Sequence, residues 1–184
     1  GVSPNHGRLS RLNIIESVHA CLERLQVDYI DLLYFHLFDS TTPAEESLSA
    51  IEDLVKEDAI RYFAVSNFTV DQLKLYQSLE SHFSIHVRVL AVQNKFDIIS
   101  LEDDQKPGVL DYCAQSGLSF VAWSPLLKGL LTDKCQDLTG VGPGDRLYDE
   151  GTLDSALERY DLLRIKKLAL LSKEWGITLN QLVI

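Results

Sequence analysis

The sequence has little of what marks several large classes of protein. Its three cysteines, Cys21, Cys113 and Cys135, are odd in number and far apart. They indicate neither a disulfide framework nor a zinc site of paired spacing, and we expect reduced thiols. No apolar run approaches the about 20 residues of a membrane-spanning helix, and the first residues lack the pattern of a signal peptide. These absences predict a soluble cytoplasmic protein without a membrane partner.

Basic charge is also scarce, since 17 Lys and Arg residues stand against 27 Asp and Glu, for a net charge of −10. No basic stripe is present to neutralise phosphates, so we expect no nucleic-acid partner. The sequence further lacks a glycine-rich Rossmann turn, a P-loop, a nucleophile elbow and a metal-binding motif. Metal is therefore not expected, and any nucleotide cofactor must be bound by another architecture.

What the sequence does have is a repeated pattern of short apolar runs that end in polar or aromatic side chains. The 184 residues are 46% hydrophobic, enough for a chain of this length to bury roughly 70% of its unfolded surface. The runs are residues 32–36, 63–67, 90–94 and 120–124. Runs of this kind predict buried parallel strands, whose carboxyl ends open onto one common face. The groups that end the runs are His36, Ser66-Asn67, Gln93 and Trp123-Ser124.

Helical patterns separate these runs, and this alternation predicts an α/β fold with a mostly parallel sheet. The predicted helices are residues 10–25, one beginning at 42–45, one capped by Thr69, residues 105–116, residues 153–175 and a short one capped by Thr178. Residues 128–152 break the rhythm with several glycines. That stretch predicts either a lid or binding loop, or a solvated surface excursion.

Each of the polar groups at the strand ends has an ordinary structural explanation. A lone histidine is commonly a hydrogen-bonded structural residue, Ser66-Asn67 is typical turn chemistry, and Trp123 could pack in a core. Gln93 is harder to explain in this way, because a buried amide without partners costs about 1–3 kcal/mol. A bound ligand is one way to satisfy it. The other histidines, His6, His19, His82 and His86, are predicted to be surface residues.

Residues 25–36, 61–68, 92–94 and 122–131 together resemble the aldo-keto reductases, in the right order and spacing. The resemblance covers nearly the whole chain. It implies a (β/α)8 TIM barrel that reduces aldehydes and ketones with NADPH and has no Rossmann domain. A small-molecule carbonyl compound is then the expected substrate.

The resemblance also implies a role for each of nine residues. His36 would orient and polarise the substrate carbonyl. Ser66, Asn67 and Gln93 would hydrogen-bond the nicotinamide carboxamide, and Trp123 would stack on the nicotinamide ring. Those that would wrap the cofactor's phosphates, largely through backbone amides, are Ser124, Leu126, Gly129 and Leu130.

The sequence departs from the family in what it leaves out. The catalytic Asp, Tyr and Lys and the segment that recognises the adenosine 2′-phosphate are not among these residues. We therefore expect a partial (β/α)8 barrel holding about half of the βα units, a single domain over residues 1–184 that is truncated at both ends. We expect the isolated chain to be inactive, and its exposed sheet edges to favour self-association.

Two alternatives remain open. One is a non-catalytic nucleotide-binding or regulatory protein of the same fold, similar to the channel-associated β subunits. The other is an unrelated TIM-barrel lyase with a phosphate site in the long loop, which the combination of Ser66-Asn67, Gln93 and Trp123 argues against.

Overall fold

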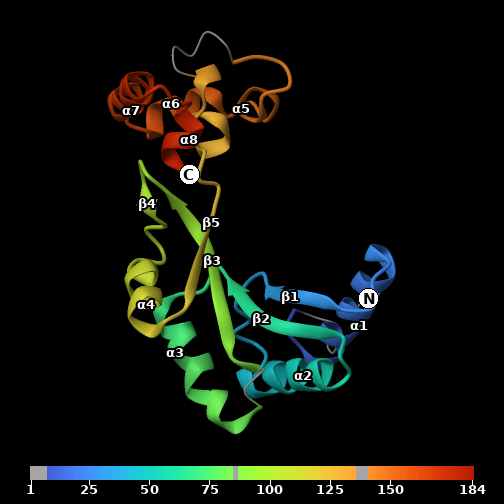
Figure 1. Cartoon of the computed structure of the whole chain (residues 1–184). Helices are drawn as coiled ribbons and strands as arrows, with labels where there is room; N and C mark the ends of the chain where they lie inside the picture. The colour runs from blue at the N-terminus through green and yellow to red at the C-terminus, as the bar shows by residue number, and fades with distance from the viewer. Residues whose placement is uncertain (1–7, 85–86, 136–140) are drawn as a thin grey trace. The chain divides into compact units, whose positions relative to one another are not determined.

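The computed structural model describes residues 8–84, 87–135 and 141–184 (Figure 1). The chain divides into two compact units. The first unit is Gly1–Asn94 with Asp104–Val121, and the second is Lys95–Asp103 with Ala122–Ile184. Among the described residues, no helix has both the length and the apolar character that a membrane crossing requires.

Helices and strands alternate along the chain, as predicted. In the first unit they are α1 (Arg11–Leu25), β1 (Ile30–Phe35), α2 (Ala44–Lys56), β2 (Ile60–Ser66), α3 (Val70–Leu79), the 3-10 helix η2 (Glu80–His82) and α4 (Val109–Ser116). β3 (Val89–Asp97) and β5 (Ser119–Trp123) begin in the first unit and end in the second. The second unit holds β4 (Leu101–Glu102), the 3-10 helices η4 (Leu127–Gly129) and η5 (Asp133–Cys135), α5 (Arg146–Asp149), α6 (Leu153–Arg159), α7 (Leu162–Trp175) and α8 (Leu179–Val183).

The strands form one sheet in which the predicted parallel pairing is confirmed. β1 pairs with β2 and β2 pairs with β3, both in parallel, and β5 also pairs with β3. The short β4 was not predicted and pairs with β3 in antiparallel fashion. In this register Ser66 of β2 lies opposite Gln93 of β3. The carboxyl ends of β1, β2 and β3 therefore point the same way, which is the arrangement that the sequence pattern required.

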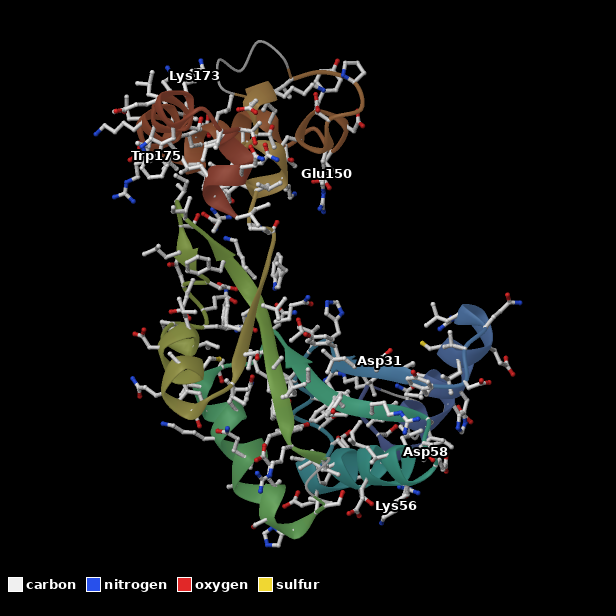
Figure 2. All side chains as sticks on the ribbon, viewed as in Figure 1. Asp31, Lys56, Asp58, Glu150, Lys173 and Trp175 are labelled. Atoms are coloured by element: carbon white, nitrogen blue, oxygen red, sulfur yellow. The ribbon has the colours of Figure 1, made fainter. Side chains whose placement is uncertain are left out.

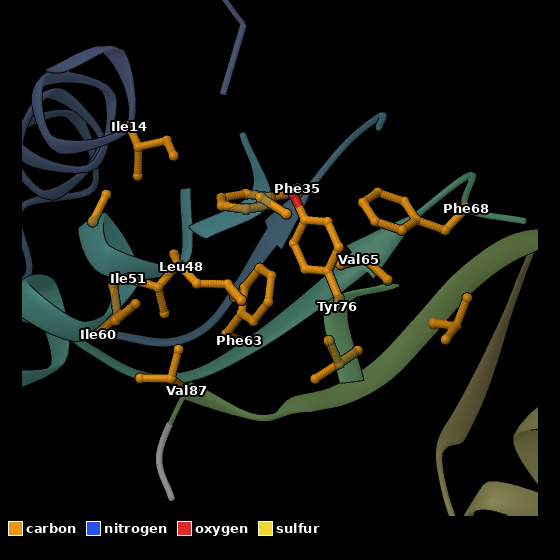
Figure 3. Close-up of a cluster of buried hydrophobic side chains, with 14 of the residues drawn as sticks. Ile14, Phe35, Leu48, Ile51, Ile60, Phe63, Val65, Phe68, Tyr76 and Val87 are labelled. Atoms are coloured by element: carbon orange, nitrogen blue, oxygen red, sulfur yellow. The ribbon is translucent and has the colours of Figure 1, made fainter. Parts of the chain in front are cut away.

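The core of the first unit lies between one face of the sheet and its helices (Figure 3). Phe63 of β2 is fully buried, with its ring centroid 4.6 Å from that of Phe35 on β1 in an edge-to-face arrangement. Tyr76 of α3 packs on the same group of rings, and burial raises the pKa of its hydroxyl to about 12. Side chains alternate along a strand, so the neighbouring Tyr62 lies on the other face, where 52% of it is exposed.

The predicted helix at residues 105–116 is wrong at its start. The helix α4 begins only at Val109, and residues 104–108 form turns. Pro107 disfavours a helical conformation for the residue before it. Gly108 then occupies the N-cap position with φ 75°, which is outside helical geometry. The predicted stop at Gly117 is confirmed, with φ 71°.

The single helix predicted for residues 153–175 is also wrong, because the structure has two helices, α6 and α7. They are separated at Tyr160 and Asp161. The Asp161 carboxylate accepts hydrogen bonds from the amides of Leu163 and Arg164, at 3.0 and 3.2 Å, and so caps a new helix. The stretch at residues 128–152 contains short helical elements, since η4, η5 and α5 fall in or next to it, and residues 136–140 lie outside the described residues.

Two of the predicted helix caps are confirmed in detail. Thr69 and Gln72 form a reciprocal capping box at the start of α3, and Thr178 and Gln181 form another at the start of α8. Ser10 occupies the N-cap position of α1, but its side chain makes no capping bond. Threonine and serine satisfy the first free amides of a helix when their hydroxyl reaches back to them.

We expect Thr69→Ala to lower the free energy of unfolding by about 1 kcal/mol, because the cap of α3 is lost. Urea unfolding followed by circular dichroism measures this change. Thr69→Ser keeps the capping hydroxyl and is the matched control, expected to stay near the wild-type value. Equal losses in the two variants would show that the cap does not stabilise α3.

Candidate functional site

The ends of β1 and β2 and the middle of β3 place four of the predicted site residues together in the first unit. The prediction that Gln93 ends its strand is wrong, because β3 continues to Asp97. Ser66 ends β2, Asn67 follows it, and His36 follows the last residue of β1. Gln93 of β3 lies opposite Ser66 in the sheet. We call these four residues the strand-end cluster. The β-sheet register alone therefore brings together residues that lie far apart in the sequence.

Hydrogen bonds tie the strand-end cluster across all three strands. The Ser66 hydroxyl donates to the Gln93 carbonyl at 2.7 Å, and the Asn67 amide N–H donates to the same oxygen at 3.0 Å. The Asn67 side-chain nitrogen donates to the His36 carbonyl at 2.9 Å and to the Ser66 hydroxyl at 3.1 Å. Ser66 and Asn67 thus fix the relative positions of the three strands, so part of their chemistry is structural.

The backbone of Asn67 has the left-handed conformation, with φ 59°. Most side chains avoid this region at a cost of about 1–2 kcal/mol, whereas asparagine tolerates it. The conformation turns the chain away from the sheet directly after β2. Asparagine at this position therefore both tolerates the left-handed backbone and donates the side-chain hydrogen bonds.

Two members of the strand-end cluster keep their side chains available for a ligand. The His36 imidazole is exposed and the Gln93 amide is half-buried. Within the described part of the chain, neither side chain hydrogen-bonds to another group. A half-buried amide offers two donors and an acceptor, which matches a carboxamide ligand, and an imidazole can donate to a carbonyl oxygen. Because the Gln93 amide has no hydrogen-bond partner among the described residues, it is free to bond the carboxamide of a nicotinamide at this site.

The other predicted site residues lie in the second unit, at and after the end of β5. Trp123 is the last residue of β5 and is 38% exposed. Left-handed backbone then recurs at Ser124, with φ 61°, and at Gly129, with φ 107°. The amide of Gly129 donates to the Leu126 carbonyl at 2.9 Å and that of Leu130 to the Leu127 carbonyl at 3.2 Å. These two amides are used within turns.

Leu130 also has a packing role, because its side chain is fully buried in the core of the second unit. The side chains around it come from η4, α5, α6 and α7. The structure therefore groups the nine predicted residues into two sets, one in each unit. His36, Ser66, Asn67 and Gln93 form the first set, and Trp123, Ser124, Leu126, Gly129 and Leu130 form the second.

Sequence reasoning missed Asp39, which lies in the loop that follows His36. Only 3% of Asp39 is exposed, and its carboxylate accepts hydrogen bonds from the hydroxyls of Thr41 and Thr42 at 2.6 and 2.7 Å. It also accepts from the amides of Thr41 and Leu9, at 2.9 and 3.2 Å, and Arg8 lies 3.5 Å away. Burial alone would raise the pKa of Asp39, but these hydrogen bonds together hold it well below its usual range.

We expect Asp39→Asn to destabilise the first unit at neutral pH by about 1–3 kcal/mol, because four donors lose a carboxylate acceptor. A carboxyl group whose pKa is lowered in the folded state stabilises the fold at pH values above its unfolded pKa of about 3.9. This stabilisation is lost as the pH falls below that value. Wild-type stability should thus decline from about pH 4 downward, and the variant should lack this part of the decline.

Urea unfolding at several pH values measures both effects. Asp31→Asn, at an exposed position of β1, is the matched control and should leave stability at neutral pH unchanged. A pH profile of Asp39→Asn that matched the wild type would contradict the role given to this carboxylate.

Asn94, next to Gln93, supports the same end of the sheet. Its side chain is buried, and its nitrogen donates to the Phe68 carbonyl at 2.8 Å, which anchors the segment that follows Asn67. Its side-chain oxygen has no hydrogen-bond partner among the described residues. Among all the described residues, no group of three or more His, Cys, Asp or Glu side chains is placed to hold a metal ion.

A parallel α/β sheet with a histidine and amide-bearing side chains at adjacent strand ends is organised as the β/α-barrel enzymes are. The comparison with known families agrees with this class of protein and identifies one family within it. The model of the Aldo/keto reductase family matches residues 1–184. The chain belongs to the aldo/keto reductase family, whose members generally bind NAD(P)H and catalyse oxidation and reduction.

Individual relatives agree with this assignment. An aldo-keto reductase of Fusarium vanettenii is 35% identical over 127 residues, which cover 69% of this chain and 34% of that protein. A probable voltage-gated potassium channel subunit beta of Oryza sativa subsp. japonica is 30% identical over 198 residues, which cover 100% of this chain and 56% of that protein. The crystal structure of a thermostable aldo-keto reductase with the inhibitor epalrestat superposes with a TM-score of 0.68 at 28% identity, covering 96% of this chain and 52% of that one.

The match to this crystal structure confirms the predicted α/β fold and supports a partial TIM barrel. The chain spans about a third of the first fungal relative and about half of the channel subunit and of the crystallised reductase.

Proposed function

We propose that this protein is an NADPH-dependent oxidoreductase that reduces aldehydes or ketones to alcohols, and that the present chain supplies its nicotinamide-binding residues. The observation that carries the proposal is the strand-end cluster, in which Ser66 and Asn67 hold the ends of β1 and β2 against β3, beside the Gln93 amide that has no partner among the described residues. Membership of the aldo/keto reductase family supports the reaction class.

Each residue then has a distinct task. NADPH supplies the hydride when it is bound. Gln93 hydrogen-bonds the carboxamide and so selects which face of the ring is presented, while Ser66 and Asn67 keep Gln93 and His36 in place. His36 donates to the carbonyl oxygen of the substrate and orients it. Trp123 stacks on the ring, and the segment with Ser124, Leu126, Gly129 and Leu130 binds the phosphates.

We further propose that the 184-residue chain binds the cofactor without turning over a substrate. Reduction of a carbonyl needs a proton donor for the oxygen on which negative charge develops. None of the seven tyrosines lies in a sequence context that matches the family's proton donor, and the accompanying Asp and Lys have no counterpart among these residues. His36 is assigned to orient the carbonyl oxygen, so none of the assigned residues takes the role of that proton donor.

The test is a turnover assay with the purified chain, NADPH and a reactive aromatic aldehyde. We expect NADPH consumption to equal that of the reaction without protein. Steady consumption above this background, lost in His36→Ala, would overturn the proposal of an inactive chain while supporting the proposed reaction.

A second candidate is a non-catalytic nucleotide-binding or regulatory protein of the same fold. The observation that favours it is the extent of the match to the plant channel subunit, which covers the whole chain, whereas the fungal reductase matches over 69% of it. The intact mass and the turnover of the native protein separate the two functions. A native protein that binds NADPH but consumes none with any aldehyde offered would favour the regulatory function.

We also propose a cytoplasmic location and self-association. Among the described residues, neither Cys21 nor Cys113 forms a disulfide, which suits a reducing compartment. Among the described strands β1 has only β2 as a neighbour, so its other edge keeps unpaired backbone groups that could bond a second copy. Sedimentation velocity at rising protein concentration tests this. A monomer at every concentration would contradict self-association.

A further inference from the structure

The outward face of α7 carries two leucines that are largely exposed. Leu163 is 71% exposed and Leu170 is 67% exposed, and they lie two helical turns apart on one side of the helix. The buried residues of α7 are Ile165, Ala169 and Ser172, on the opposite side. The helix is thus apolar on both sides, although only one side packs on the core of the second unit.

Lysines surround these two leucines in a chain whose net charge is strongly negative. Lys166 and Lys167 lie between the leucines, and Lys173 lies one turn beyond Leu170; all three are exposed. They form no ion pair with any described residue. Glu174 is the acidic residue on this side of the helix, so its local charge remains positive. Figure 2 labels Lys173 and Trp175 of this helix. We call Leu163, Lys166, Lys167, Leu170 and Lys173 the α7 outer face.

We propose that the α7 outer face binds an acidic amphipathic segment of a partner protein. The two leucines would enter the apolar side of that segment, and the three lysines would pair with carboxylates that flank it. Exposed leucines spaced by two turns and framed by like charges are what a helix offers to a complementary partner helix. The charge of the surface selects an acidic partner.

Other occupants fit the α7 outer face less well. A second copy of α7 would bring lysines against lysines. Helices that lie in a membrane surface have a broad apolar side, whereas here Lys166 and Lys167 interrupt the two leucines.

The first experiment uses the full 184-residue chain and a synthetic probe. The probe is a fluorescein-labelled helical peptide with leucines at every third and fourth position and glutamates between them, followed by fluorescence anisotropy. A peptide of the same composition in scrambled order is the control. We expect the patterned peptide to bind, the scrambled peptide to bind at least about tenfold more weakly, and the affinity to fall with added salt.

Variants locate the binding. Leu163→Glu with Leu170→Glu should weaken the patterned peptide by at least about tenfold, and Lys166→Glu with Lys167→Glu should weaken it and reduce its salt dependence. Leu12→Glu with Leu75→Glu places the same charges at exposed leucines of α1 and α3, 41% and 43% exposed, and should change nothing. Circular dichroism of each variant checks that the helices are intact.

Several outcomes would overturn the proposal. These are equal affinity for the two peptides, equal losses in the α1/α3 control, and no binding at all. Binding to phosphatidylserine vesicles but not to the peptide would assign the face to a membrane. Sedimentation that shows dimers in the wild type and monomers in Leu163→Glu with Leu170→Glu would assign it to a second copy. None of these results depends on cofactor binding or turnover.

Discussion

Replacing Asn67 with alanine is expected to lower the free energy of unfolding of the first unit by about 2–4 kcal/mol. The variant loses the two hydrogen bonds of the side-chain nitrogen, to the His36 carbonyl and the Ser66 hydroxyl, each contributing about 0.5–1.5 kcal/mol. It also forces alanine into the left-handed backbone that asparagine adopts with φ 59°. Because the strand ends then loosen, we expect NADPH to bind more weakly as well.

Asn67→Gly separates these two contributions. Glycine adopts positive φ without steric cost, so this variant loses the side-chain hydrogen bonds but keeps the turn. We expect a smaller loss of stability than in Asn67→Ala, measured by urea unfolding of both variants under the same conditions. If Asn67→Ala were as stable as the wild type, the hydrogen bonds across the strand ends would not hold the strand-end cluster together.

Removing the Phe63 ring has the largest expected effect on stability, about 3–5 kcal/mol for Phe63→Ala. The side chain is fully buried, and its ring packs edge-to-face on Phe35 and close to Tyr76. The cavity left behind lies under the strand from which Ser66 and Asn67 extend. A loss of this size removes a large fraction of the stability of a small domain.

Tyr62→Ala is the matched control, since it removes an aromatic ring from the adjacent position of the same strand. Tyr62 is 52% exposed and lies on the other face of the sheet, so we expect a loss below about 1 kcal/mol. Urea unfolding followed by circular dichroism compares the two variants. Similar losses for Phe63→Ala and Tyr62→Ala would contradict the assignment of the core to the helix-covered face.

The strands were predictable because each is a short apolar run with a polar residue at its end, as at Val65, Ser66 and Asn67. The break between α6 and α7 was not predicted, because apolar residues continue at helical spacing on both sides of Asp161. Only the capping bonds of that side chain show that a new helix begins there. Similarly, Gly108 at positive φ delays the start of α4 within a sequence that otherwise looks helical.

The site was predictable to the same degree. The sequence placed His36, Ser66, Asn67 and Gln93 at strand ends, and the structure brings these four together, although Gln93 lies inside β3. The sequence could not show that the Asn67 side chain donates a hydrogen bond to the His36 carbonyl, because that bond depends on the pairing of β1 with β2. Asp39 was missed for a related reason, since one of its partners is the amide of Leu9, far upstream of the loop that holds it.

The most direct test of the central proposal is quenching of tryptophan fluorescence by NADPH in the 184-residue chain. The chain has two tryptophans, Trp123 and Trp175, and the proposal assigns ring stacking to Trp123 alone. We predict saturable quenching in the wild type and in Trp175→Phe, none beyond inner-filter absorption in Trp123→Phe, and at least about tenfold weaker binding in Gln93→Ala. Quenching that persists in Trp123→Phe, or an affinity unchanged in Gln93→Ala, would contradict it.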